Sequence, residues 1–301
     1  EHCLLAIRQS LFEDGKSAPA LLELEIILVL NHEDDREHAS SLISTFDLTG
    51  FALCDEPGFN FSRKCNLGAN HASGQIVVFL NDDTAFETKG WASHVISLLE
   101  EEDVACVGGL LLNSDRTVQS CGDNIGRNSA VHYVPNRSAA TVGDAMHRYI
   151  SDHETTAISG AFFCCRKHTY EDLGGFSLAF PNSFQDVDFC LRARQKQMRC
   201  LVSPHIRLLH FESVSRNPTV GDQTLSLIRN IHASTMTPTD PFALWAYEIP
   251  QPRIISRAGI LHYLAVIKKL LKRTVFMILV HMQPGPSHPR YILNKNEWRV
   301  R

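Results

Sequence analysis

Apolar and polar positions alternate along the first third of the chain in a pattern that predicts an α/β fold. Continuous apolar runs rich in β-branched residues are typical of strands covered on both faces, and they predict strands at 24–30, 75–80 and 104–112, with a shorter strand at 51–54. Apolar residues spaced three or four apart predict helices at 1–13, 35–46, 61–72 and 91–101. Because strands that alternate with helices build a parallel, doubly wound sheet, we expect a mostly parallel sheet flanked by helices.

The second half of the chain is less regular. Residues 113–157 are polar and predict loops, with one short strand at 130–134. Further strands are predicted at 158–165, 200–203 and 206–211, helices at 166–173 and 185–197, and a turn at Gly174 and Gly175. The pattern weakens from about residue 217, where prolines recur. We therefore expect an α/β domain over 1–216 and a mainly helical C-terminal extension over 217–301.

Composition narrows the class of protein. The 301 residues are 44% hydrophobic and carry a net charge of −4, which fits an ordinary globular protein. A general nucleic-acid binder would show a basic excess, so no nucleic-acid partner is expected. The nine cysteines are an odd number without any CxxC pair, which predicts free buried thiols in a reducing compartment. The first residues lack a signal-peptide pattern, so we expect a cytoplasmic location.

Three oxygen-bearing side chains, Asn81, Asp82 and Asp83, follow the predicted strand at 75–80. Ligands of open α/β sheets bind beyond the carboxyl ends of the strands, and oxygen donors suit a hard cation such as Mg²⁺ or Mn²⁺. The same residue types are also common in a polar turn after a strand. Taken alone, this triplet favours the turn.

Two more positions carry possible chemistry. Asp186 and Asp188 fall in the first turn of a predicted helix, where they either stabilise the helix dipole or accept a proton from a substrate hydroxyl. His210 ends an apolar strand, and a lone histidine there is more often structural than a ligand. Each signal is weak by itself.

The order of several motifs changes this weighing. The front half contains FNFSR at 59–63, NLG at 66–68, ASG at 72–74 and FLNDD at 79–83. The back half contains SGA at 159–161, GGF at 174–176, FQDVDFCLR at 184–192, HFES at 210–213 and SR at 215–216. Over residues 20–216 the chain resembles family 2 glycosyltransferases with the GT-A fold, a Rossmann-like α/β fold. It looks like the bacterial branch that builds cell-surface polysaccharides.

The resemblance implies transfer of a sugar from a nucleotide-diphosphate donor to an acceptor hydroxyl on a glycan or lipid-linked acceptor. Asp186 stands at the position of the catalytic base, and Asp83 and His210 stand where the family binds Mg²⁺ or Mn²⁺. The positions that approach the nucleotide sugar are Asn81, Asp82, Arg63, Asn66 and Gly68. The positions on the sugar and acceptor side are Ser159, Gly160, Gly175 and Asp188. A metal ion would neutralise the leaving diphosphate, and attack from the opposite face would invert the anomeric carbon.

Two departures from the family pattern concern the nucleotide pocket. The family opens with an apolar strand whose terminal turn forms part of that pocket, and this sequence begins in what looks like the helix after it. Either the sequence starts beyond that strand, or the strand at 24–30 is a central strand without such a neighbour. Leu30 replaces an Asp that helps hold the nucleobase, so Asn31, Asp34 or Asp35 would have to substitute. One alternative is therefore a catalytically impaired binding or scaffold protein. Another is a nucleotidyltransferase, which would need a Gly-rich basic loop that this chain lacks after its first strand.

Residues 259–282 are apolar but are interrupted by Lys268, Lys269, Lys272 and Arg273. A spanning helix needs about 20 mostly apolar residues, so we do not expect a single membrane span. A basic amphipathic helix could lie on an anionic membrane, at the inner face of the plasma membrane. Packing on the α/β domain or an oligomer contact explains the same pattern, and these two together are slightly favoured.

Overall fold

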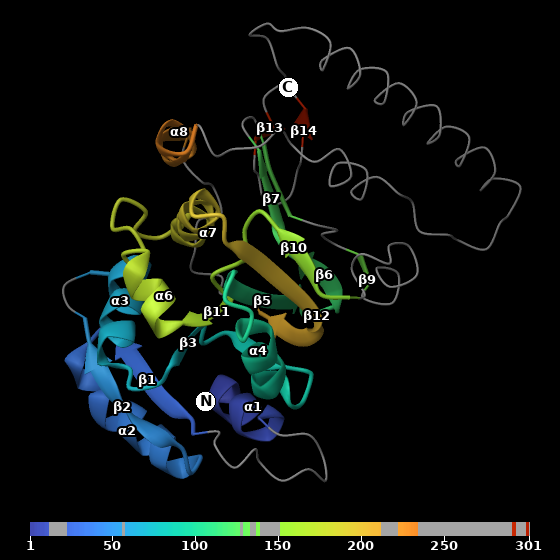
Figure 1. The fold of residues 1–301 in the computed structure, drawn as a ribbon. Coiled ribbons are helices and arrows are strands. Elements are labelled where there is room, and N and C mark those ends of the chain that lie inside the picture. The colour runs from blue at the N-terminus through green and yellow to red at the C-terminus, as the bar shows by residue number, and fades with distance from the viewer. Residues whose placement is uncertain are drawn as a thin grey trace, which may run out of the picture.

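The computed structural model describes residues 1–11, 23–55, 58–126, 129–132, 137–138, 151–211, 222–233, 291–292 and 299–300 (Figure 1). The helices in this part are α1 (His2–Ser10), α2 (Arg36–Thr45), α3 (Phe61–His71), α4 (Trp91–Leu99), α6 (Lys167–Asp172), α7 (Gln185–Gln195) and α8 (Asp222–Ile231), with a 3-10 turn η1 (Glu33–Asp35). The main strands are β1 (Glu25–Leu30), β2 (Thr49–Cys54), β3 (Ile76–Leu80), β4 (Thr84–Phe86), β5 (Val104–Leu112), β11 (Phe162–Arg166) and β12 (Arg199–His210). Shorter strands are β6 (Thr117–Ser120), β7 (Asp123–Gly126), β8 (Ser129–His132), β9 (Arg137–Ser138), β10 (His153–Thr155), β13 (Tyr291–Ile292) and β14 (Arg299–Val300).

The central sheet has the strand order β10-β12-β5-β11-β3, with β4 paired to β12 and β6 to β5. β5 and β12 run parallel, whereas β11 lies antiparallel between β3 and β5. β3, β5 and β12 therefore point the same way, and their carboxyl ends lie at one edge. The expected α/β sheet flanked by helices is confirmed. The insertion of β11 was not predictable from the sequence, because strand periodicity carries no information on direction.

β1 and β2 form a separate parallel pair, with Leu30 opposite Cys54. The run at 24–30 predicts a strand covered on both faces, but every residue of β1 is only partly buried. Ile26 and Leu28 pack toward the core on one face. On α3, Gly68 comes close enough to Val29 that an added Cβ would touch its side chain at 3.4 Å. β1 lies outside the central sheet, and α3 contacts it through Gly68 and Val29. Its residues therefore stay only partly buried.

The sheet separates two hydrophobic clusters. In β3, Val77 and Phe79 belong to one cluster, while Ile76, Val78 and Leu80 pack against the other. This is the alternation that successive strand residues produce. The first cluster contains residues of α3, α6 and α7, and the second contains residues of α1 and α4. Figure 1 shows α6 and α7 on one side of the central sheet and α1 and α4 on the other.

Three predicted segments differ from the structure. Residues 113–157, predicted as loops with one short strand at 130–134, contain the strands β6, β7, β8, β9 and β10. The strand predicted at 158–165 begins only at Phe162, so Ser159 and Gly160 lie in the connection before β11. The strands predicted at 200–203 and 206–211 are one strand, β12, with a register shift between Ser203 and Arg207. Pro204 explains the irregularity, since proline has no N–H to donate to a sheet.

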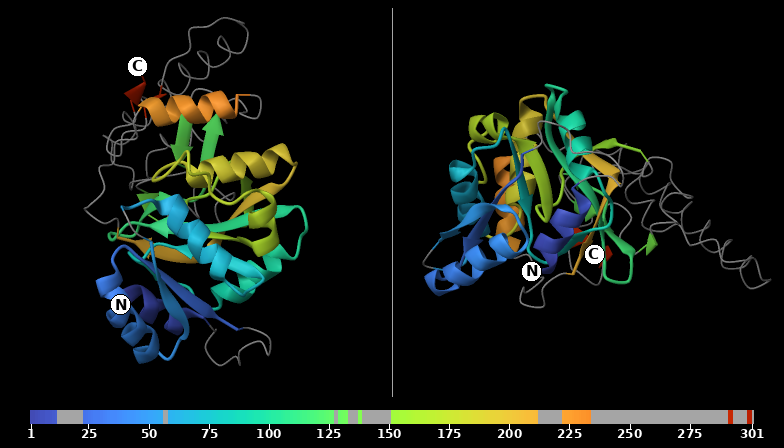
Figure 2. Two further views of the ribbon diagram at one scale, coloured as in Figure 1. Left: turned by 90° about the vertical axis from the view of Figure 1, so that its left-hand side faces the viewer. Right: turned by 90° about the horizontal axis from the view of Figure 1, so that it is seen from below.

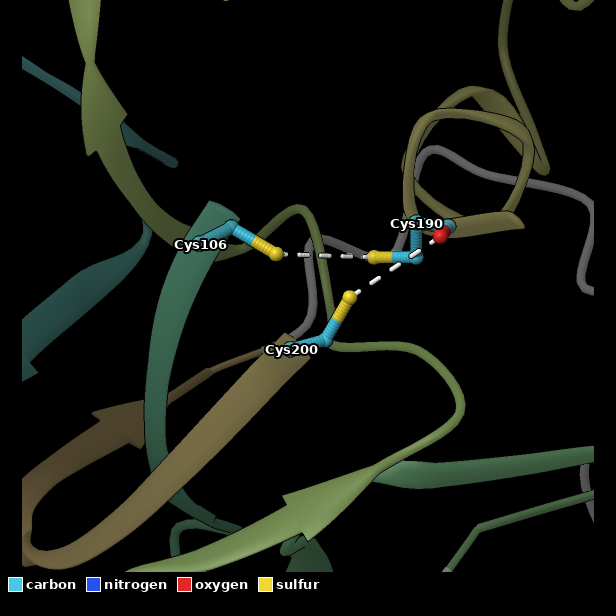
Figure 3. A group of neighbouring side chains, drawn as sticks. All are labelled: Cys106, Cys190 and Cys200. Atoms are coloured by element: carbon cyan, nitrogen blue, oxygen red, sulfur yellow. Dashed lines mark hydrogen bonds between the residues drawn. The ribbon is translucent and has the colours of Figure 1, made fainter. Parts of the chain in front are cut away.

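All nine cysteines are free, as predicted, and seven of them are buried. The sulfurs of Cys106, Cys190 and Cys200 come from β5, α7 and β12 and lie within 4.8 Å of one another (Figure 3). Cys106 Sγ lies 3.8 Å from Cys190 Sγ, and Cys200 Sγ donates to the Cys190 carbonyl at 3.9 Å. Burial raises the pKa of Cys106 and Cys190, which keeps them as neutral thiols. All three side chains are completely buried within the first hydrophobic cluster, and we therefore assign this group to core packing.

Little of the C-terminal extension is described. α8 lies beside α7 (Figure 2), and its Ile228 is part of the first cluster. The predicted boundary after residue 216, the segment 259–282 and most of the mainly helical extension lie outside the described residues. Within the described part of the chain, none of the helices has both the length and the apolar character needed to cross a bilayer.

Candidate active site

The Asn81–Asp83 triplet occupies the turn between β3 and β4. The Asn81 N–H donates to the Ala161 carbonyl at 3.0 Å, and Thr84 Oγ1 donates to the Asn81 carbonyl at 2.7 Å. Asp82 is exposed, whereas the Asp83 side chain is only 20% exposed. The turn interpretation is therefore correct for the backbone, and the same turn presents a half-buried carboxylate at the sheet edge.

His210 lies beside this turn at the end of β12. β12 pairs with β4, which places His210 opposite Thr84, and the Phe211 N–H donates to the Asp83 carbonyl at 2.9 Å. His210 Nε2 is 3.2 Å from Asp83 Oδ1 and 3.3 Å from Asn81 Nδ2. Residues more than 120 positions apart in the sequence thus meet at one end of the sheet.

The donor atoms of Asp83 and His210 fit a divalent ion. A carboxylate oxygen and an imidazole nitrogen are both ligands used for Mn²⁺, and the oxygen suits Mg²⁺. Two adjacent ligands of an octahedral ion bound at the Mg²⁺ distance are about 3 Å apart. The 3.2 Å between Asp83 Oδ1 and His210 Nε2 is close to that separation.

Asp186 lies in the first turn of α7, as predicted from the sequence. Its Oδ2 accepts a 2.7 Å hydrogen bond from the Gly160 N–H, and its Oδ1 accepts one of 2.9 Å from the Val187 N–H. Burial raises the pKa of Asp186, with a smaller contribution from the negative charge of Asp123, against the lowering effect of the Gly160 hydrogen bond. A carboxylate with a raised pKa is a better proton acceptor near neutral pH.

The connection before β11 joins Asp186 to the Asn81–Asp83 turn. Gly160 bonds Asp186, and the next residue, Ala161, bonds Asn81 through its carbonyl. A Cβ on Gly160 would lie 3.2 Å from Asp186 Oδ2, so only glycine gives this approach without displacement. Ser159 accepts a 3.3 Å bond from the Ala161 N–H and is partly exposed. The structure therefore brings the predicted base, the turn and His210 into one neighbourhood.

A second group of predicted residues lies at the ends of β1 and β2. Asn31 is exposed directly after β1. Arg63, in the first turn of α3, donates from Nε to both oxygens of Asp55 at 2.7 and 2.9 Å. Asp55 follows β2, and its N–H donates to the Leu30 carbonyl at 3.1 Å. Asp55 is therefore a carboxylate beside the position where the family pattern has an Asp and this chain has Leu30.

Asp55 and Lys64 were missed by the sequence reasoning. Asp55 had a usable signal, since it follows a predicted strand as Asn81 does. Lys64 had none: it is 7% exposed, and its Nζ donates to the Leu30 carbonyl. Burial lowers the pKa of Lys64.

Asn66 and Gly175 belong together in an internal cluster. Asn66 Oδ1 accepts from the Tyr170 hydroxyl at 2.6 Å and from the Phe176 N–H at 2.9 Å, and its Nδ2 donates to the Phe176 carbonyl at 2.8 Å. Gly175 has a φ of 66°, and a Cβ there would lie 2.8 Å from Asn66 Oδ1. The predicted turn at Gly174 and Gly175 is confirmed, and Asn66 holds it. These contacts indicate that Asn66 and Gly175 stabilise the fold.

Asp188 and Gly68 also contact protein. Asp188 is 3% exposed, and its Oδ2 accepts from Arg192 Nε at 2.9 Å. Its Oδ1 lies 2.8 Å from His232 Nε2, just beyond α8. Gly68 faces Val29. We therefore leave Asp188 and Gly68, like Asn66 and Gly175, outside the group that would contact substrate.

Residues 2–171 match the sequence model described as "Glycosyl transferase family 2". The O-antigen biosynthesis protein RfbC of Myxococcus xanthus is 28% identical over 193 residues, which are 64% of this chain and 15% of that protein. The uncharacterized protein y4gI of Sinorhizobium fredii (strain NBRC 101917 / NGR234) is 26% identical over 165 residues, or 54% of this chain and 18% of that protein. The chain spans less than a fifth of the length of these relatives.

Among solved structures, GalNAc-T7 with UDP, GalNAc and Mn²⁺ superimposes with a TM-score of 0.50 at 13% identity. The match covers 64% of this chain and 38% of that one. At this identity the likeness concerns the fold alone, and it agrees with the GT-A fold expected from the sequence.

Proposed function

We propose that this chain, which belongs to glycosyl transferase family 2, moves a sugar from a nucleotide-diphosphate donor to an acceptor hydroxyl, with Mg²⁺ or Mn²⁺ as cofactor and with inversion. The observation that carries the proposal is the connection through Gly160 and Ala161. It ties the Asp186 carboxylate to the turn that holds Asp83 beside His210. Displacement of a diphosphate needs a base and a bound cation near each other, and residues 160 and 161 link the side chains that would supply them.

Asp83 and His210 would hold the ion, and the ion when bound would neutralise charge that develops on the leaving diphosphate. Asp186 accepts the proton of the acceptor hydroxyl. The Gly160 and Val187 N–H groups fix both of its oxygens, so the carboxylate is oriented before substrate arrives. Attack from the face opposite the leaving group inverts the anomeric carbon in one step. No second nucleophilic carboxylate is required, as in inverting hydrolysis.

The donor nucleotide would lie across the ends of β1, β2 and β3. Arg63 is held by Asp55, and Asn31 and Asp82 are exposed at the neighbouring strand ends. These three side chains supply hydrogen-bonding groups for a base and a ribose, and Ser159 borders the sugar side. The Leu30 side chain cannot accept a hydrogen bond from a nucleobase. Arg63, Asn31 and Asp82 would therefore make most of the hydrogen bonds to the donor nucleotide.

The biological setting is proposed from one relative. RfbC is named as an O-antigen biosynthesis protein, and this chain matches part of it. Synthesis of a cell-surface polysaccharide, with a glycan or lipid-linked acceptor, is consistent with that likeness. Such an enzyme would act in the cytoplasm or at the inner face of the plasma membrane.

One observation favours a second candidate function, a binding or scaffold protein without transfer activity. Leu30 stands where the family has a nucleobase-contacting Asp. If Asp55, locked to Arg63, does not compensate, donor binding would be weak even with Asp83, Asp186 and His210 in place.

The test is calorimetry of the chain with UDP and GDP, with and without Mn²⁺, followed by assays of nucleotide release from their sugar derivatives. We expect metal-dependent binding of one of the two nucleotides and turnover of its sugar form. Asp186→Asn should retain the binding and lower turnover by about 10²–10⁴-fold. The matched control is Asp172→Asn, an exposed carboxylate on α6. Wild-type binding without turnover would favour the scaffold, and undiminished turnover in Asp186→Asn would remove its role as base.

A further inference from the structure

His210 has two ring nitrogens with different surroundings. Nε2 faces Asp83 and Asn81, while Nδ1 lies 2.7 Å from Gln119 Oε1 on β6. A neutral imidazole carries its proton on one nitrogen only, and the hydrogen bond of one nitrogen decides what the other can do. The hydrogen bond at Nδ1, on the side of the ring away from Asp83, therefore decides which nitrogen of His210 carries the proton.

The amide of Gln119 is itself oriented by a chain of side-chain hydrogen bonds. Gln119 Nε2 donates to Asn113 Oδ1 at 3.2 Å, and Asn113 Nδ2 donates to Thr117 Oγ1 at 2.8 Å. The Thr117 hydroxyl donates to Asp115 Oδ1 at 2.6 Å. The hydrogen bonds from the Thr117 hydroxyl and the Thr117 N–H lower the pKa of Asp115, which keeps it an ionised, purely accepting group.

The direction of this chain follows from its charged end. An ionised carboxylate can only accept, so the Thr117 hydroxyl donates its hydrogen bond to Asp115 and accepts one from Asn113 with a lone pair. Asn113 then presents its carbonyl oxygen to the Gln119 NH₂ group. Gln119 must in turn present its own carbonyl oxygen to His210, and His210 Nδ1 must carry the proton.

We propose that Gln119 is a positioning residue that holds His210 with Nδ1 protonated, so that Nε2 accepts from Asn81 Nδ2 and is free of a proton for a cation held between it and Asp83. The inference rests on the proposed function, since it concerns the nitrogen that would hold the cation. A ligand imidazole commonly donates its second N–H to a neighbouring acceptor, which fixes both the tautomer and the ring orientation. Gln119 supplies that acceptor from a strand that carries no predicted site residue.

The hairpin that carries Gln119 is anchored to the strand beside the site. Asn113 and Thr117 close the β5–β6 turn, with the Asn113 N–H donating to the Thr117 carbonyl at 2.9 Å. Arg116 in the same turn pairs with Glu87 at 2.9 Å, next to β4. Because β4 pairs with the end of β12, the hairpin is held in place relative to His210.

The first experiment reads the tautomer without any metal. Long-range ¹H–¹⁵N correlation of histidine-labelled protein, at a pH where imidazole is neutral, distinguishes Nδ1–H from Nε2–H. The His210 signals are assigned by their loss in His210→Asn. We expect the Nδ1–H form in the wild type and a mixture of forms in Gln119→Leu. A wild-type His210 protonated on Nε2 overturns the inference.

The second experiment measures the affinity for Mn²⁺ by electron paramagnetic resonance of the free ion. Gln119→Leu should weaken binding by about 10- to 100-fold. Gln119→Glu keeps an acceptor for His210 Nδ1 but loses the donor to Asn113, so it should bind Mn²⁺ more tightly than Gln119→Leu. Thr117→Val, which breaks the chain two links away, should give a smaller loss. The matched control is Gln75→Leu, an exposed glutamine before β3.

The outcomes separate this inference from the proposed function. Equal Mn²⁺ affinity in Gln119→Leu and the wild type overturns the positioning role, whatever the tautomer. The expected tautomers without any Mn²⁺ binding by the wild type overturn the proposed metal-dependent function while supporting the orientation of His210. If Gln119→Leu does not fold, the comparison of Gln119→Glu and Thr117→Val with the wild type decides the same question.

Discussion

Gly160 donates its backbone N–H to Oδ2 of Asp186 over 2.7 Å, and this bond links the connection before β11 to the first turn of α7. The approach depends on the absence of a side chain, because a Cβ at position 160 would lie 3.2 Å from the same oxygen. The orientation of the proposed base Asp186 therefore depends on the glycine at position 160.

Gly160→Ala should reduce turnover while leaving the fold intact. The added methyl group displaces the Asp186 carboxylate by a few tenths of an ångström, and misplacement of about 1 Å costs on the order of 10²-fold in rate, so we expect roughly a tenfold loss. Turnover and thermal unfolding measure the two effects. Gly74→Ala is the control, since its Cβ would make only an ordinary 3.4 Å contact. Equal turnover in both variants would contradict the orienting role.

The rate should depend on pH through Asp186. Burial raises its pKa above the ordinary Asp value of about 3.9, so the ionised form is disfavoured in the fold. A base works only when ionised, and kcat/KM should therefore rise with pH through this raised pKa and fall as the solution becomes more acid. The measurement is the pH profile of kcat/KM at saturating Mn²⁺. An acid limb centred at or below the ordinary Asp value, with the fold intact there, would speak against Asp186 as the base.

Asp83→Ala should weaken nucleotide binding only when a divalent ion is present. Mutation of a residue that only hydrogen-bonds a metal ligand lowers metal affinity by about tenfold or more, so loss of a direct ligand should lower it at least as much. Calorimetry with UDP and GDP, with and without Mn²⁺, measures the difference. Glu102→Ala is an exposed acidic control just before β5. The same weakening with and without metal would remove Asp83 from the ligands.

His232→Ala should destabilise the protein. The mutation removes one of the two partners of the buried Asp188 carboxylate, which then keeps only Arg192. A hydrogen bond to a charged group contributes about 1.5–3 kcal/mol, and we expect a loss of that order in the free energy of unfolding. Urea denaturation measures it, with the exposed His168→Ala as control. A His232→Ala variant as stable as this control would contradict a stabilising role of the His232–Asp188 hydrogen bond.

The sequence also indicated much of the candidate site. The motifs at 79–83, 184–192 and 210–213 indicate Asp83, Asp186 and His210. In the structure Asp83 lies beside His210, and Gly160 and Ala161 link Asp186 to the Asn81–Asp83 turn. Motif position did not distinguish side chains that face a substrate from those that hold the fold. Asn66 and Asp188 lie within motifs, yet their polar atoms bond other protein groups. Gln119 lies in no motif, and only the folded hairpin places it against His210.

Local pattern by itself determined the elements from 24 to 112 except η1 and β4, the free thiols and the turn at Gly174 and Gly175, because periodicity, burial and backbone conformation are encoded by neighbouring residues. Tertiary structure alone decided that β11 runs antiparallel between β3 and β5, that β1 pairs only with β2 among the described strands, and that Asp55 lies beside Leu30. These relations join residues far apart along the chain. They depend on which surfaces pack against each other, and no local pattern encodes that choice.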